Sequence, residues 1–159
     1  MSEPATEVGA LLLVAAERLA AAGVPDEALV RIERRRGLLG PRDRMVELGR
    51  VWRVGVLLIA RDGAAYTTGR TIRADASERM GFTSNDARER QEERRAAVHD
   101  GFRPGEVLNL DWGPLDVDDD LLVRWSPGAD PVPLATYLDD RVGLLVERAG
   151  VQRPDGPPA

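Results

Sequence analysis

The chain contains no cysteine, so no disulfide can hold its fold together. Its stability must come from a hydrophobic core, and no thiolate is present to bind a metal ion. The 159 residues, 43% of them hydrophobic, suffice for such a core, because chains of this size bury about 68–70% of their unfolded surface. We therefore expect one domain over residues 1–149. Three prolines among the final ten residues predict a disordered tail over residues 150–159.

The spacing of apolar residues predicts an α+β fold with the order α-α-β-β-α-β-β-α. Apolar residues recur every three to four positions in the expected helices and alternate or run together in the expected strands. The Asp62-Gly63 pair predicts a hairpin between two of these strands. Since strands joined by short links pair antiparallel, we expect a four-stranded, mainly antiparallel sheet with helices on one face. The eight elements are expected at residues 5–22, 25–36, 50–60, 65–73, 83–99, 106–112, 121–125 and 134–148.

All 22 basic residues are arginine, and no lysine occurs in the chain. Without lysine and cysteine, the chain has no Schiff-base amine, no Ser–Lys dyad, no phosphate-loop lysine and no thiol nucleophile. Its one histidine is His99. Because familiar covalent catalysis needs groups that this chain lacks, the sequence favours a binding role over an enzymatic one, and no cofactor is expected.

The net charge of −5 hides two segments of opposite charge. Residues 31–53 hold eight arginines and three acids, which gives +5, whereas residues 104–123 hold six acids and no arginine, which gives −6. Such segments either pair with each other or are offered to partners. The acidic run at 116–120 lacks the glycine and the closing glutamate of a calcium loop, so no metal site is expected there.

Two residues, His99 and Asp111, are the candidates for catalysis. A histidine that an acid orients acts as a general base, so a hydrolase using carboxylates and His99 is the first alternative to a binding role. A histidine at the end of a helix also has a simpler explanation, because a cation there complements the helix dipole. A single histidine without cysteine does not make a common zinc site.

The candidate binding residues are arginines, whose planar guanidinium groups form paired hydrogen bonds with phosphates and carboxylates. The segment 31–53 also supports a second alternative, weak nucleic-acid binding. Against it stand the negative net charge and the lack of nearby aromatic residues for base stacking. The three tryptophans, Trp52, Trp112 and Trp125, lie on expected strands and are expected to pack in the core. The candidate arginines are Arg31, Arg34, Arg35, Arg36, Arg70 and Arg73.

Three segments carry a resemblance to known sequences: VRIERRR at 30–36, GRTIRA at 69–74 and GEVLNLDW at 105–112. Through them the chain resembles, over roughly residues 10–148, a family of short uncharacterised proteins from high-GC bacteria. Some members of that family bear a glutaminase label, so the resemblance implies amide hydrolysis. The residues conflict with this activity, because such enzymes use a Ser-x-x-Lys pair, a nucleophilic cysteine, or threonine with lysine. No catalytic residue is carried over from the family.

The expected function is therefore that of a small intracellular binding or regulatory module, which holds a protein partner or a small anionic ligand. No apolar run is long enough to span a membrane. The run at residues 10–16 is flanked by acids and follows no basic leader. We expect a soluble, cytoplasmic protein with no membrane partner, and leave open whether it forms a homo-oligomer.

Overall fold

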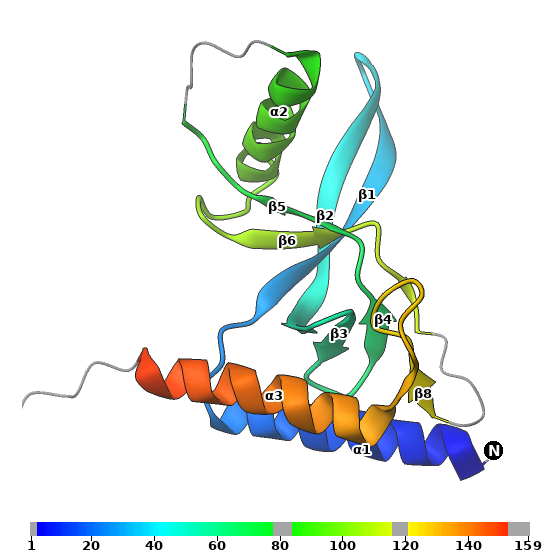
Figure 1. The fold of residues 1–159 in the computed structure, drawn as a ribbon. Coiled ribbons are helices and arrows are strands. Elements are labelled where there is room, and N and C mark those ends of the chain that lie inside the picture. Colours follow the sequence, from blue (N-terminus) through cyan, green and yellow to red (C-terminus); the bar gives the residue numbers. More distant parts are fainter. Residues whose placement is uncertain (1–2, 78–83, 116–120, 153–159) are drawn as a thin grey trace, which may run out of the picture. The chain divides into compact units, whose positions relative to one another are not determined.

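The computed structural model describes residues 3–77, 84–115 and 121–152 (Figure 1). These residues contain three helices and nine strands, which confirms the α+β class. The predicted order of eight elements is wrong, because the observed order along the chain is α1-β1-β2-β3-β4-β5-α2-β6-β7-β8-β9-α3. In the same residues, none of the helices combines the length and the apolarity that crossing a bilayer requires.

A mixed seven-stranded sheet replaces the four-stranded sheet that the sequence predicts. Its hydrogen-bonded order is β5-β6-β1-β2-β3-β4-β7, and β8 and β9 form a separate two-stranded sheet. The pairing of β1 with β6 is parallel, whereas β5 with β6 and β2 with β3 are antiparallel. By their internal contacts, the residues divide into two compact units. That residues 1–149 fold as one domain stays a prediction.

The first unit, here called the helix-pair unit, comprises Met1–Asp26, Val51–Thr68 and Gly113–Ala159. Helices α1 and α3 lie side by side in it (Figure 1), and their apolar stripes share one core with the end of β2 and with β3. The predicted helices at 5–22 and 134–148 are confirmed, and α3 extends further. The elements of this unit, besides the end of β2, are α1 (Glu3–Ala21), β3 (Leu57–Ala60), β4 (Ala65–Thr67), β7 (Gly113–Pro114), β8 (Leu122–Val123), β9 (Val132–Pro133) and α3 (Leu134–Val151).

The second unit, here called the ribbon unit, comprises Glu27–Arg50 and Gly69–Trp112. One face of its strands packs against α2 around the buried side chains of Val30, Ala97 and Phe102. Ser84 caps α2 by accepting a hydrogen bond from the N–H of Ala87 at 3.3 Å, which confirms the predicted helix start. The elements are β1 (Glu27–Gly37), β2 (Gly40–Val54, which continues into the other unit), β5 (Arg70–Arg73), α2 (Asn85–His99) and β6 (Val107–Leu110).

The predicted helix at 25–36 is wrong, because this segment is the strand β1. Its residues have fair helix propensity, but propensity is a weak influence that tertiary contacts override. Here β6 supplies a parallel partner, with Ala28 opposite Leu108 and Leu29 opposite Asn109. The run Ala28 to Val30 is buried, while Ile32, which a helix would have buried, is 40% exposed.

The predicted strand at 50–60 is in fact two strands with a turn between them. Gly55 has a φ of +62°, and Val54 pairs with Leu57 across the turn. The Asp62-Gly63 hairpin is confirmed, because β3 and β4 pair antiparallel on either side of it. A Cβ at Gly55 would lie 2.0 Å from the Tyr137 hydroxyl, so the position requires glycine.

The predicted strand at 65–73 also divides into two, because β4 pairs with β3 and β7 whereas β5 pairs with β6. Gly69 stands at the division, and a Cβ there would lie 2.2 Å from the carbonyl oxygen of Leu110. A close backbone approach of this kind is a common reason for a glycine within an extended segment. The predicted tail begins too early, since α3 continues through residues 150 and 151, and residues 153–159 lie outside the described part of the chain.

The three tryptophans do not share one environment. Trp52 is 3% exposed and donates its indole N–H to the carbonyl oxygen of Val24 at 2.8 Å, so packing is confirmed for it. Trp112 is partly buried, follows β6 and donates to the carbonyl oxygen of Val30 at 2.9 Å. Trp125 is 46% exposed and lies outside the strands, so the core prediction is wrong for this residue.

Candidate anion-binding site

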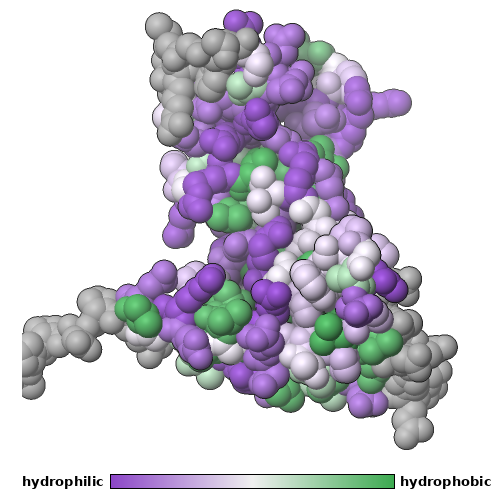
Figure 2. Space-filling model, in the orientation of Figure 1, coloured by the Kyte–Doolittle hydropathy of each residue, from purple (hydrophilic) through white to green (hydrophobic). Residues whose placement is uncertain are grey.

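The arginines of segment 31–44 are displayed on an antiparallel pair of strands, here called the arginine ribbon. β1 pairs with β6 at Ala28 and Leu29, and its remaining residues run beside β2 to a two-residue turn at Leu38 and Leu39. The surface over the ribbon and α2 is mostly hydrophilic (Figure 2). Six exposed arginines lie on the ribbon: Arg31, Arg34, Arg35, Arg36, Arg42 and Arg44.

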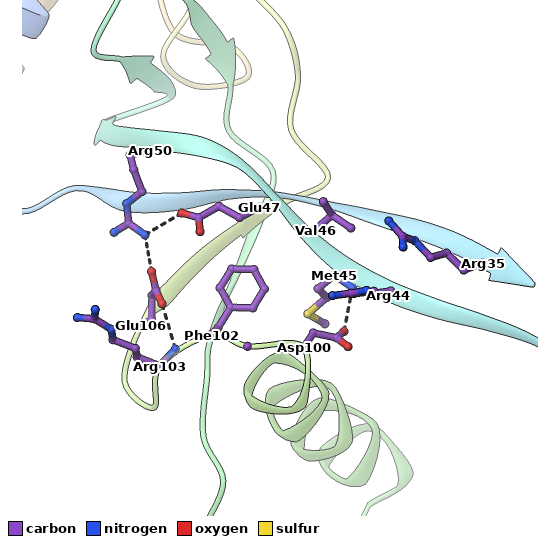
Figure 3. A pocket seen from close by; sticks show the side chains of 11 residues that line it. Arg35, Arg44, Met45, Val46, Glu47, Arg50, Asp100, Phe102, Arg103 and Glu106 are labelled. Atoms are coloured by element: carbon purple, nitrogen blue, oxygen red, sulfur yellow. Dashed lines mark hydrogen bonds and ion pairs between the residues drawn. The ribbon is translucent and has the colours of Figure 1, made fainter. Parts of the chain in front are cut away.

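A cavity of about 490 Å³ lies between β2 and the loop that joins α2 to β6. At one end of this cavity Arg50 faces two acids at close range (Figure 3). Arg50 donates to Glu47 at 3.1 Å and also to Glu106, and the other Glu106 oxygen accepts the backbone N–H of Arg103 at 3.1 Å. The charge at this end of the cavity is therefore already neutralised. The contact between Arg50 and Glu106 joins the basic segment 31–53 to the acidic segment 104–123.

Asp100 fixes the end of α2 against the ribbon. It is the residue that follows the helix, and its carboxylate accepts the backbone N–H of Met45 at 2.9 Å and a guanidinium N–H of Arg42 at 3.3 Å. The side chain is only 5% exposed. A carboxylate that is almost buried needs such donors, and by taking them it holds β2 at a fixed distance from the helix.

A second cavity, of about 350 Å³, shares Arg35, Arg44 and Asp100 with the first. Unlike the Arg50 end of the first cavity, it has an excess of positive charge. It is lined by Arg35, Arg36, Gly37, Arg42, Arg44, His99 and Asp100. Four arginines against one aspartate leave a net charge of +3 when the histidine is neutral. Among the residues that the structure describes, Arg36 and Arg44 make no ion pair, and Arg35 reaches Glu33 only at 3.7 Å. We call this cavity the arginine pocket.

The structure brings some of the predicted site residues together and separates others. Arg35 and Arg36 line the arginine pocket, as does His99. Arg31 instead lies over the ring of Trp112, with its guanidinium carbon 5.9 Å from the ring centre, and Arg34 is exposed outside both cavities. The sequence prediction missed Arg42 and Arg44 as pocket residues, although both belong to the arginine cluster from which it was made.

Arg70 belongs to a different cluster, in which acids surround it. Its two terminal nitrogens donate to Glu93 at 2.6 and 2.7 Å, and its Nε donates to Asp111 at 2.5 Å. The paired hydrogen bonds to Glu93 raise the pKa of Arg70 still further above its ordinary value, with Asp111 adding to the effect and partial burial opposing it. Since each of its three guanidinium nitrogens donates to an acid, Arg70 is a structural cation here. Arg73, which donates to the carbonyl oxygen of Gly105 at 2.8 Å, lines a separate cavity.

His99 and Asp111 do not meet. His99 ends α2 and is exposed beside the ribbon, while Asp111 follows β6 and pairs with Arg70. Asp111 also has a φ of +54°, a left-handed conformation, where its carbonyl oxygen closely approaches Gly69. No group of three or more histidine, aspartate or glutamate side chains is arranged to hold a metal ion within the described residues. The geometry therefore gives the hydrolase alternative no shared site.

Comparisons with protein-family models, with curated proteins and with solved structures find no match for the chain.

Proposed function

We propose that this chain is a binding module whose arginine pocket holds a small anionic ligand. The observation that carries the proposal is the +3 charge of one 350 Å³ cavity, in which Arg36 and Arg44 make no ion pair among the described residues. Arginines from two adjacent strands line this one volume, and guanidinium groups form paired hydrogen bonds with phosphate or carboxylate groups.

The pocket size favours a compact polyanion. A volume of about 350 Å³ lies near the lower end of ligand cavities, about 300–1,000 Å³. A diphosphate group offers several oxygen atoms within the reach of Arg35, Arg36 and Arg44 without filling the pocket. The carboxylates of an acidic protein segment offer similar chemistry in a longer ligand, and an acidic peptide is therefore the second probe in the test.

The test is titration calorimetry with inorganic pyrophosphate and with an octapeptide of glutamates, at low and at moderate salt. The variant R36Q/R44Q should weaken pyrophosphate binding by at least about 30-fold, because it removes two charge-assisted contacts. The matched control is R88Q/R148Q, which makes the same change in net charge at two exposed arginines outside the pocket.

Binding that is equally weakened in the two double variants would assign the effect to overall charge and refute the pocket. The same conclusion follows if neither probe binds the unmodified chain at low salt. Tighter binding of the peptide than of pyrophosphate, with loss in R36Q/R44Q only, would support the pocket and identify an acidic protein segment as its ligand. Circular dichroism melting of each variant separates loss of binding from loss of fold.

A further inference from the structure

The tip of the arginine ribbon carries two fully exposed leucines. Leu38 and Leu39 form the turn between β1 and β2, and their relative exposures are 108% and 104%. Gly40 follows with a φ of +108°, a conformation that glycine adopts without strain. Tight turns usually carry glycine, asparagine, aspartate or serine. Two leucines here add nothing to either core, so their apolar surface is available to a partner.

The charge around the tip is of one sign. Residues 34–42 contain four arginines and no acid, and the first acids on either strand are Glu33 and Asp43. The ribbon therefore presents leucines at its end and cations directly behind them. A complementary partner has an anionic outer layer, which meets the arginines, and an apolar layer beneath it, which receives the leucines. A membrane surface that contains anionic phospholipids has this order of layers.

We propose that the Leu38–Leu39 tip inserts into an anionic phospholipid surface while the arginines behind it bind the headgroup phosphates. A strand rises about 3.3 Å per residue, which places Arg36 and Arg42 about 7–10 Å behind the leucines. Surface-bound segments bury their apolar side about 5–10 Å into the headgroup boundary, so both guanidinium groups reach the phosphate level. The proposal rests on the proposed function in one respect, namely that these arginines bind phosphate-type groups.

The observations favour a lipid surface over a nucleic-acid duplex. A two-stranded ribbon can lie along the major groove, but its length would then bring Glu33, Asp43 and Glu47 close to the phosphates. Contact through the tip presents only the acid-free residues 34–42. This inference departs from the expectation of no membrane partner, which considered spanning segments and a leader but no surface contact.

The experiment is co-sedimentation of the full chain with vesicles of phosphatidylcholine containing 30 mol% phosphatidylglycerol (a composition chosen for the test). The variant L38S/L39S should bind these vesicles at least about 30-fold more weakly, because two leucine side chains no longer leave water. The matched control is V14S/V151S, which removes two exposed apolar side chains that lie outside the ribbon. Val14 on α1 is 55% exposed, and Val151 on α3 is 86% exposed. Pure phosphatidylcholine vesicles should bind neither protein.

Absence of vesicle binding by the unmodified chain, or equal binding by L38S/L39S and the unmodified chain, would overturn the proposal. The proposal would also be overturned if the chain bound no vesicles but bound a 20-base-pair DNA duplex, and if L38S/L39S weakened that DNA binding. This result would assign the tip to nucleic acid. Pyrophosphate titration distinguishes this failure from failure of the arginine pocket. L38S/L39S should bind pyrophosphate as the unmodified chain does, whereas R36Q/R44Q should not.

Discussion

The hydroxyl group of Tyr137 on α3 accepts a hydrogen bond from the backbone N–H of Val56 at 2.8 Å and donates to the carbonyl oxygen of Val54 at 3.4 Å. It thereby binds both sides of the turn at Gly55. Tyr137 is 5% exposed, so this polar contact lies within the core of the helix-pair unit and fixes where the β2–β3 hairpin meets α3.

The first prediction concerns this contact. G55A should lower the free energy of unfolding by about 3 kcal/mol or more, because the new methyl group would overlap the Tyr137 hydroxyl and the positive φ is strained for alanine. Y137F should cost about 1–2 kcal/mol through the lost hydrogen bonds. Urea denaturation measures both. The double variant G55A/Y137F should lose less stability than the sum of the losses in the two single variants. Strict additivity of the losses would show that the two residues do not meet.

The second prediction concerns Asn109, which is fully buried on β6. Its amide nitrogen donates to Glu27 at 2.8 Å and to the carbonyl oxygen of Ala28 at 3.2 Å. N109D places a second carboxylate beside Glu27, so it should lower the free energy of unfolding at pH 7 by about 3 kcal/mol or more.

The pH dependence of that loss has a definite sign. Burial and the neighbouring carboxylate would raise the pKa of an aspartate at 109 in the folded state. The destabilisation is then largest above the folded pKa and shrinks as the pH falls toward about 4, the unfolded value of aspartate. Denaturation of N109D and the unmodified chain at pH 7 and pH 4.5 measures the change. A loss that is the same at both pH values would contradict this account.

The third prediction separates Arg70 from ligand binding. R70K keeps the charge but loses the paired hydrogen bonds to Glu93 and the Nε contact with Asp111. Because these groups are partly exposed, the loss of stability should be modest, about 0.5–1.5 kcal/mol. Pyrophosphate affinity should stay unchanged, and a clear loss of affinity in calorimetry would place Arg70 in the binding site.

The fourth prediction uses the one acid of the arginine pocket. D100N removes a negative charge but keeps an oxygen that can accept the N–H of Met45. Pyrophosphate should therefore bind about 3–10-fold more tightly, since a unit charge several ångströms away contributes about 1 kcal/mol near a protein surface. D139N, which removes an exposed carboxylate of the helix-pair unit, is the control. Weaker binding by D100N than by D139N would count against the pocket.

The sequence allowed the helices and one hairpin to be predicted because their signals are local. The apolar stripes of α1 and α3, the serine that caps α2 and the Asp62-Gly63 turn each depend on residues within a few positions of one another. For the candidate site, the sequence revealed the arginine cluster. It did not reveal which of these arginines line the same pocket.

What the sequence determined by itself is chemical: without cysteine or lysine and with a single histidine, the chain carries arginine as its only fixed cation. The tertiary structure alone decided that residues 27–37 form a strand, because the parallel partner β6 lies about 80 positions further along the chain, with Ala28 opposite Leu108. The same pairing decided the site. As a helix the segment would have spread its arginines around an axis, whereas as a strand beside β2 it brings Arg35 and Arg36 together with Arg42 and Arg44.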